Sequence, residues 1–327
     1  MPDFNKTWLP SASLDVLRWR AHMLQKIRAF FAERSVLEVE TPLLSHASIP
    51  DPALHSFKTD YFVDTTYSKS KTFYLQTSPE FAMKRLLAAG SGSIYQISKA
   101  FRNGGEAGRY HNPEFTLLEW YRIDFTHHDL MTEVDTLLQM LLSCRAGERL
   151  TYQQVFQRYL EIDPHKASIE VLQQCAQHHQ IAADYLQTLD HDAWLQLLMT
   201  HLIEPQLPDY PVFIYDFPAS QAALARIRND EIAVAERFEV YVNGLELANG
   251  FHELSSAEEQ RQRFLINQTQ RKTLGYEAIP LDEHLLAALS QGLPNCAGVA
   301  LGLDRLLLLI SQTKTIQDVL AFPIERA

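Results

Sequence analysis

The stretch Phe101–Arg122, FRNGGEAGRYHNPEFTLLEWYR, predicts two strands joined by a long loop. The apolar segments SIYQISKAF and EFTLLEWYRIDF flank about ten polar, glycine-containing residues, as expected for antiparallel strands. Loops this long in a compact domain are usually functional. The pattern therefore predicts an antiparallel hairpin whose loop has a functional role.

The composition is that of a globular protein, with 327 residues of which 46% are hydrophobic. Cys144, Cys175 and Cys296 have neither the spacing of a zinc site nor an even number for disulfides. The chain shows no signal peptide and its longest apolar run is LLLLI, so we expect a cytoplasmic protein. A balance of 29 basic to 40 acidic residues, net −11, disfavours binding to extended nucleic acid.

Hydrophobic periodicity predicts an α+β fold with an antiparallel sheet flanked by helices. Ser13 precedes an amphipathic helix, and the strand VLEVETPLL follows it. Helical patterns dominate from about 126 to 207, and strands return in the C-terminal third. Because no linker or low-complexity tract interrupts the sequence, we expect one domain over residues 1–327.

Two further local patterns concern helices. Ser78 and Pro79 predict the start of a helix that holds Glu80 at its first turn. Four histidines occupy polar helical positions without metal-ligand spacing, so we expect them to be solvated. These are His127, His128, His178 and His179.

The dipeptide Asn243-Gly244 predicts a two-residue hairpin turn that places Tyr241 opposite Glu246. Glu239 then lies on the same sheet face as Glu246. Two carboxylates so placed can share Mg²⁺ ions bound to phosphates. The alternative, two solvated glutamates on an exposed face, is the commoner situation.

Farther along this strand, Asn249, Phe251 and Glu253 alternate out of phase with Glu246. A regular strand would therefore send these side chains to the opposite face. A bulge near Asn249-Gly250 would bring them back to the same face, and glycine in a strand often marks such a bulge.

Two arginines accompany glycines in patterns suited to a phosphate group. Arg102 ends one strand of the first hairpin, and Arg305 begins a helix after Gly298 and Gly302. Guanidinium groups and a helix N-terminus favour a triphosphate, although a lone arginine is more often a surface ion pair. The chain has no P-loop and no dinucleotide-binding fingerprint, so ATP would require a different fold.

Glu119 and Tyr121 alternate with apolar residues on the returning strand and share one face. A carboxylate beside a phenol can receive an ammonium group. A strand with one polar edge is the alternative.

Together these segments resemble the catalytic domain of class II aminoacyl-tRNA synthetases, specifically the lysyl enzymes. VLEVETPLL with Pro42 resembles motif 1, FRNGGEAGRYHNPEFTLLEWY motif 2 and GVALGLDR motif 3, and RFEVYVNGLELANGFHEL resembles the lysine-type strand pair. The resemblance covers nearly the whole chain. It is closest to the lysyl-enzyme paralogues that attach (R)-β-lysine to a lysine of elongation factor P.

This resemblance implies an ATP-dependent, AMP-forming ligase that uses Mg²⁺, forms a homodimer and modifies elongation factor P without charging tRNA. It implies no anticodon-binding domain, because the motif 1 helix begins almost at the N-terminus. The implied catalytic residues are Arg102 at the α-phosphate and Arg305 at the γ-phosphate, and Glu239 and Glu246 would bind magnesium. The implied ATP-binding set is Arg102, Asn103, Gly104, Glu106, Asn112, Glu246, Leu247, Gly302 and Arg305. The implied lysine or β-lysine site is Ser78, Pro79, Glu80, Glu119, Tyr121, Asn249, Glu253 and Ala300.

The sequence departs from the family pattern at two places. Motif 2 usually reads Arg-x-Glu, whereas Gly104 follows Asn103 here and the next acid is Glu106. This leaves open whether Glu106 makes the adenine-side contact. In motif 3, Ala300 stands where lysyl enzymes commonly have glycine.

Two other functions are compatible with a class II core. An amide ligase of the asparagine synthetase A kind would take aspartate, but the acidic Glu119 and Glu253 favour a cationic substrate. A non-catalytic regulatory paralogue would usually lack a motif arginine or a metal carboxylate. All four of these residues are present: Arg102, Arg305, Glu239 and Glu246.

Overall fold

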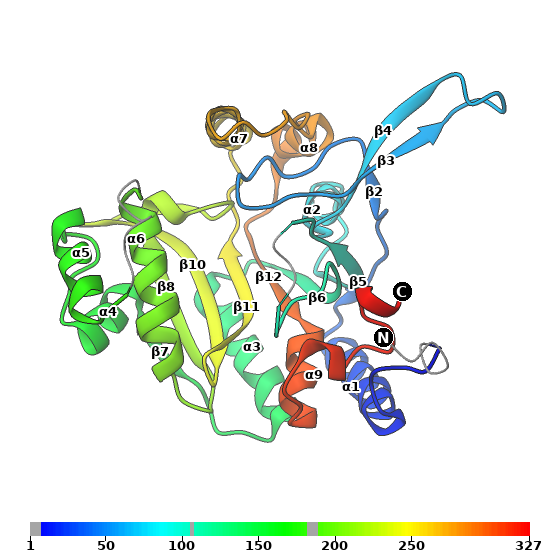
Figure 1. The fold of residues 1–327 in the computed structure, drawn as a ribbon. Helices are drawn as coiled ribbons and strands as arrows, with labels where there is room; N and C mark the ends of the chain where they lie inside the picture. The colour runs from blue at the N-terminus through cyan, green and yellow to red at the C-terminus, as the bar shows by residue number, and fades with distance from the viewer. Residues whose placement is uncertain (1–7, 105–107, 182–188) are drawn as a thin grey trace, which may run out of the picture. The chain divides into compact units, whose positions relative to one another are not determined.

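The computed structural model describes residues 8–104, 108–181 and 189–327. Contacts group the chain into two compact units. Unit 1 comprises Met1–Asp124, Ser255–Cys296 and Ala300–Ala327, and unit 2 comprises Phe125–Leu254 and Ala297–Val299. The predicted α+β class is confirmed, since a large, mostly antiparallel sheet has a portion in each unit (Figure 1).

Unit 1 combines helices with the first hairpin of the sheet. Its helices are α1 (Leu14–Ala32), α2 (Glu80–Ala88), α7 (Ala257–Thr273), α8 (Glu283–Gly292) and α9 (Leu303–Ser311), with short 3₁₀ turns at Ile316–Asp318 and Ile324–Arg326. Its strands are β1 (Leu37–Glu38), β2 (Leu44–Ser45), β3 (Lys58–Phe62), β4 (Ser70–Leu75), β5 (Ile94–Phe101), β6 (Glu114–Ile123) and the ends of β12 (Cys296–Gly302).

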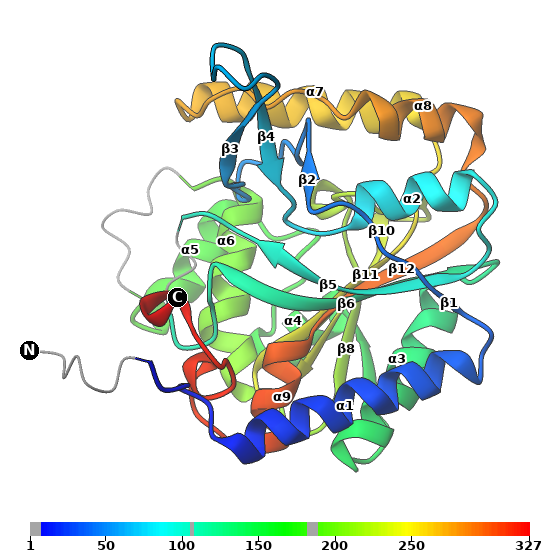
Figure 2. The same ribbon diagram turned by 90° about the vertical axis from the view of Figure 1, so that its right-hand side faces the viewer.

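The hairpin β5–β6 is the centre of unit 1, and its register confirms the antiparallel strands predicted from the sequence. Tyr95 pairs with Trp120, and the ring of Phe31 on α1 stacks on Tyr95 and meets Trp120 edge-on. The next pair, Gln96 and Glu119, therefore points to the opposite face. Figure 2 shows α1 on one side of β5–β6 and α2 on the other. Glu119 thus faces α2.

The start of α1 follows from its sequence, because the Ser13 hydroxyl caps the helix by accepting a hydrogen bond from Val16 N. The helix α2 begins one residue later than the sequence pattern suggests, at Glu80, and the Ser78 hydroxyl accepts a 3.0 Å hydrogen bond from Glu80 N. Gly90, at φ +88°, ends it as predicted.

In unit 2 the strands follow the order β11–β10–β8–β7, with β9 beside β10. Its strands are β7 (Glu148–Thr151), β8 (Val212–Pro218), β9 (Ile227–Asn229), β10 (Ala233–Val242), β11 (Leu245–His252) and residues 297–299 of β12. Its helices are α3 (His127–Leu142), α4 (Tyr152–Leu160), α5 (Ile169–His178) and α6 (His191–Leu198), followed by a π turn at Met199–Ile203 and 3₁₀ turns at Glu204–Gln206 and Ala219–Gln221.

The core of unit 2 joins α4 and α6 to one face of the sheet. Tyr152, Phe156 and Trp194 from the helices cluster with Ile214 and Tyr241 from the strands, all nearly fully buried. Because side chains alternate along β10, Glu239 lies on the same face as Tyr241, and Glu236 lies on the other.

The β10–β11 turn is as predicted: Asn243 and Gly244 have φ of +53° and +72°, and Tyr241 pairs with Glu246. The bulge is present but earlier than expected. Val240 pairs with Ala248 while Tyr241 pairs with Glu246, so Leu247 is the extra residue. As a result Glu239 pairs with Asn249, and Glu246 and Asn249 reach the same face.

Gly250 does not mark the bulge; it makes room for an aromatic ring. Gly250 pairs with Phe238, and a Cβ on Gly250 would lie 2.5 Å from two atoms of that ring. The glycine therefore allows Phe238 to lie against the backbone of β11.

No helix in the described part of the chain is long and apolar enough to cross a membrane.

Candidate functional site

Glu119 and Tyr121 are the most deeply buried of the predicted substrate residues that the structure describes in unit 1, each at 2% exposure. Oε1 of Glu119 accepts a 2.6 Å hydrogen bond from the Tyr121 hydroxyl, and its Oε2 accepts one of 2.8 Å from the Ser78 hydroxyl. The structure thus brings together three of the residues that the sequence assigns to the lysine site. The two hydroxyl contacts fix the orientation of both carboxylate oxygens.

Glu80 belongs to the same region but has a partner that the sequence analysis missed. The Nζ atom of Lys84 lies 2.6 Å from Glu80 Oε1, and Lys84 is only 2% exposed. The i,i+4 spacing of Glu80 and Lys84 on a helix indicates such an ion pair and could have been recognised in the sequence. Pro79, which is buried, precedes them and starts the helix.

Arg102 lies where β5 leaves the sheet, with its guanidinium carbon 5.0 Å from the centre of the Phe115 ring. Its backbone N–H donates to Pro113 O, and Asn103 N donates to His55 O at 2.7 Å. These contacts fix the start of the motif 2 loop. Gly104 is exposed with φ +83°, and Glu106 lies outside the described residues.

Arg305, at the start of α9, is joined to the far end of the motif 2 loop. Its Nη2 lies 2.8 Å from Nε2 of His111, and its Nε donates to Tyr110 O at 3.5 Å. Gly302 is the N-cap of this helix, and Ala300 lies two residues earlier on β12. The structure therefore brings the predicted γ-phosphate arginine to the predicted ATP loop within unit 1.

Asp304, the neighbour of Arg305, is a buried carboxylate that fixes this corner of unit 1. One oxygen accepts from Arg20 on α1, and the other accepts a 2.7 Å hydrogen bond from Thr116 N on β6. The sequence analysis gave Asp304 no role, because its partners lie far away along the chain.

Asn112, assigned to ATP by resemblance, makes backbone contacts in the structure. Its Nδ2 donates to Glu114 O at 2.6 Å and its Oδ1 accepts from Ile324 N at 3.0 Å. The side chain is 7% exposed, so its observed contacts hold the loop to the C-terminal segment.

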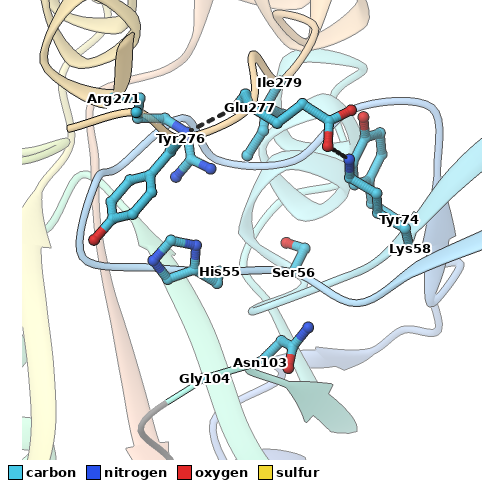
Figure 3. A pocket seen from close by; sticks show the side chains of 11 residues that line it. His55, Ser56, Lys58, Tyr74, Asn103, Gly104, Arg271, Tyr276, Glu277 and Ile279 are labelled. Carbon is cyan, nitrogen blue, oxygen red and sulfur yellow. Dashed lines mark hydrogen bonds and ion pairs between the residues drawn. The ribbon is translucent and has the colours of Figure 1, made fainter. Parts of the chain in front are cut away.

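A pocket of about 460 Å³ borders Asn103 and Gly104 (Figure 3). Its opposite wall carries Arg271, which is 4% exposed and donates to backbone carbonyl oxygens, including that of Asp51 at 3.0 Å. Lys58 pairs with Glu277 at one side. Of the predicted site residues, this pocket contacts Asn103 and Gly104, so it adjoins the predicted ATP loop.

In unit 2, Glu239 is the centre of a polar group on β10–β11. Tyr241 donates a 2.5 Å hydrogen bond to Glu239 Oε2, and Asn249 Nδ2 donates to Oε1 at 3.2 Å. Arg237 pairs with the same carboxylate and reaches Asn249 Oδ1 at 3.3 Å. Arg237 was missed in the sequence, although its position two residues before Glu239 puts both on one face.

Burial raises the pKa of Glu239, and the nearby Glu246 carboxylate raises it further against the opposing effect of Arg237. Two carboxylates that disfavour each other's ionisation suit a divalent cation, which relieves the repulsion. The residues present therefore fit the magnesium pair predicted from the sequence. No metal position follows from this geometry alone.

The remaining predicted residues of unit 2 are placed on β11 and just beyond it. Leu247, the bulged residue, is 2% exposed, and Glu253 follows β11 at 5% exposure. Glu253 pairs with Ala225 through an isolated bridge. Glu253 is thus a buried carboxylate, as an ammonium-binding role requires.

The expectation that four helical histidines are solvated is wrong for one of them. His127 is 2% exposed because the first turn of α3 packs against the sheet of unit 2. His128, His178 and His179 are exposed. A single position at a helix start does not reveal which way the side chain points, and this caused the error.

Comparison with known proteins decides the family. The family model described as tRNA synthetases class II (D, K and N) matches residues 8–326. The chain belongs to this family. The matched range includes Arg102, Arg305 and all the carboxylates discussed above.

Relatives of known name match over nearly their whole length. The chain is 53% identical over 324 residues to the elongation factor P (R)-β-lysine ligase of Vibrio cholerae, covering 99% of each chain. It is 52% identical to the ligase of the same name from Hamiltonella defensa and 51% identical to that from Salmonella arizonae, covering 98% of each chain in both cases.

Proposed function

We propose that this protein is an ATP-dependent ligase that activates (R)-β-lysine and transfers it to a lysine of elongation factor P. The observation that carries this proposal is the match of 51–53% identity, over almost the full length, to ligases of that name. The buried Glu119 and Glu253 support it, because a cationic substrate offsets the cost of burying a carboxylate.

The proposed reaction has two steps. In the first, the β-lysine carboxylate attacks the α-phosphorus of ATP, the bond to pyrophosphate breaks, and an aminoacyl-adenylate forms. In the second, the ε-amino group of the acceptor lysine attacks the acyl carbon, AMP leaves, and the amine loses a proton. Arg102 stabilises charge at the α-phosphate, and Arg305 holds the γ-phosphate.

Magnesium would be held by Glu239 and Glu246, where it neutralises phosphate charge. The proposed nucleotide set also includes Asn103, Gly104, Glu106, Asn112, Leu247 and Gly302. For Asn112 the backbone contacts described above favour a role in holding the loop that faces the nucleotide.

The proposed β-lysine site comprises two groups of side chains. Ser78, Pro79, Glu80 and Glu119 hold the reactive end with its amino group, and Tyr121, Asn249 and Glu253 hold the side-chain ammonium. Ala300 narrows the space available at the substrate end of motif 3. The hydroxyl contacts of Glu119 support this assignment, because they hold the carboxylate in a fixed orientation beside Ser78 and Tyr121.

Two other properties belong to the proposal. Resemblance to motif 1 favours a homodimer. The three cysteines are free thiols, which favours a reducing compartment such as the cytoplasm.

Aspartate activation, as in an asparagine synthetase A kind of ligase, is less favoured because buried carboxylates would repel its side chain. A regulatory role without catalysis is less favoured because the four residues named for catalysis and metal binding are all present.

The test is a pair of assays. Pyrophosphate exchange is measured with β-lysine, lysine and aspartate, and β-lysine is expected to give the fastest exchange. The enzyme is then incubated with ATP, β-lysine and either elongation factor P or bulk tRNA. Added mass on one lysine of the factor, with uncharged tRNA, is expected. Efficient tRNA charging with an unmodified factor would replace this proposal with a tRNA synthetase function.

A further inference from the structure

A second cluster of metal-ligand side chains lies in unit 2, on the face of β10–β11 opposite to Glu239. It consists of His127 at the start of α3, Glu236 on β10 and His252 at the end of β11. One ligand atom from each residue lies within 4.8 Å of the others. Glu236 and His252 face α3 because they alternate with Glu239 and Phe251 along their strands.

His127 is the unusual member of this cluster. Its imidazole is 2% exposed, and neither ring nitrogen has a hydrogen-bond partner among the described residues. Its Nε2 atom lies 3.6 Å from Asp216 Oδ1, which is beyond hydrogen-bonding distance. Buried polar groups are normally satisfied, so an imidazole in this state indicates a partner that is not a protein atom.

The carboxylates near His127 are held in place by arginines. Arg228 contacts Asp216 at 2.7 Å and Glu236 Oε1 at 3.6 Å. Arg228 donates to both oxygens of Asp216, at 3.3 and 2.7 Å, and so holds Oδ1 beside His127.

The two carboxylate oxygens of Glu236 have different partners. Its Oε2 lies 2.6 Å from His252 Nδ1 and 3.9 Å from Arg226 Nε, whereas Arg228 approaches Oε1. A cation that enters between His127, His252 and Oε2 replaces the His252–Glu236 contact and leaves the Arg228 pair intact.

We propose that His127, His252 and Glu236, with Asp216 as a fourth ligand, bind a divalent transition-metal ion of the Zn²⁺ type. Two imidazoles with carboxylate oxygens are the ligand set of Zn²⁺, whereas Mg²⁺ prefers oxygen ligands alone. A metal ion bound by these four residues would also give the buried His127 ring nitrogen a partner. An ion-pair network alone explains Asp216, Glu236 and Arg228, but it leaves His127 unsatisfied.

The metal would have a structural effect. It would tie the first turn of α3 to the end of β11, one residue before Glu253, and to β10. Ligands from a helix and from neighbouring strands restrict the motion of the strand pair relative to α3. This site is separate from the proposed magnesium carboxylates, which lie on the other face of the same strands.

The experiment measures metal binding without substrate, so its outcome does not depend on the proposed function. The full-length protein is treated with a chelator, dialysed, and titrated with Zn²⁺ by calorimetry, with Mg²⁺ as the hard-ion comparison. Binding of one Zn²⁺ per chain and a rise in melting temperature are expected. Co²⁺ should give the visible absorption bands of a low-symmetry four-coordinate site.

The His127→Leu variant removes one ligand, and the exposed neighbour His128→Leu is its matched control. His127→Leu should weaken Zn²⁺ binding by at least about 100-fold, since even outer-shell changes cost 10- to 100-fold. His128→Leu should bind Zn²⁺ as the unchanged protein does. Melting temperatures without metal will show that both variants fold. Absence of Zn²⁺ binding by the unchanged protein, or equal losses in both variants, would overturn the proposal.

Discussion

The Tyr121 hydroxyl donates a 2.6 Å hydrogen bond to Oε1 of Glu119, and the two side chains share one face of β6. With the Ser78 hydroxyl on the other oxygen, both carboxylate oxygens are held in position at 2% exposure. Charge interactions at such a buried position are stronger than at the surface, because water screens them less.

Glu119→Gln removes this charge and keeps the shape of the side chain. We expect β-lysine binding to weaken by about 160- to 4,800-fold, which corresponds to the cost of about 3–5 kcal/mol for breaking a buried charge pair. ATP binding should change little. Calorimetry with each ligand separately measures both effects. Glu114→Gln on the same strand is the control, because Glu114 is exposed and pairs with Lys99 at the surface. Parallel losses for both ligands would contradict a substrate role.

Arg102→Ala is expected to lower pyrophosphate exchange by about 10² to 10³, as does the loss of one preorganised donor to a developing charge. The control is Arg109→Ala at the other end of the same loop, where the side chain is exposed and donates to Lys314 O. If Arg102→Ala exchanges pyrophosphate as fast as the unchanged protein, the α-phosphate role is wrong.

Ala300→Gly should raise the activation of lysine relative to that of β-lysine. One methyl group in a substrate pocket is worth about 1 to 3 kcal/mol, or about 5- to 150-fold in the ratio of kcat/KM values. Ala297→Gly, at a fully buried position of the same strand, controls for a general loosening of β12. A ratio that stays constant in Ala300→Gly would remove this residue from substrate selection.

Gly250→Ala should lower the free energy of unfolding by about 1 to 3 kcal/mol, the usual effect of overpacking a core. The added Cβ would lie 2.5 Å from the fully buried ring of Phe238 and 3.0 Å from Gly298 O. Gly108→Ala is the control, since its Cβ would meet only His111 Nδ1 at 3.7 Å. Denaturant unfolding compares the two, and equal stabilities would show that Phe238 moves aside freely.

Local patterns in the sequence were sufficient to predict the two hairpins that carry most candidate residues. The Asn243-Gly244 turn fixes the pairing of Tyr241 with Glu246, because that dipeptide favours positive φ at both positions. The long motif 2 loop between β5 and β6, and the start of α9 after Gly302, also followed from short-range signals.

Features that depend on distant contacts could not be predicted. The bulge falls at Leu247 rather than near Asn249-Gly250, and nothing within the strand sequence places it there. The burial of His127 depends on strands more than 80 residues away. The hairpin β3–β4 and the helix α8 were not predicted at all, since the first is mostly exposed and the second follows a short connection.

The carboxylate of Asp304 has a consequence for how the protein folds. Its contacts with Arg20 and Thr116 join residues 284 and 188 positions apart. Contacts between such distant residues form late, because the chain must first lose the entropy of closing a long loop. Arg305 directly follows Asp304, so its guanidinium reaches its final position only after the contacts of Asp304 with Arg20 and Thr116 have formed. Helical structure should therefore return early during refolding, and competence to hold a triphosphate should return last.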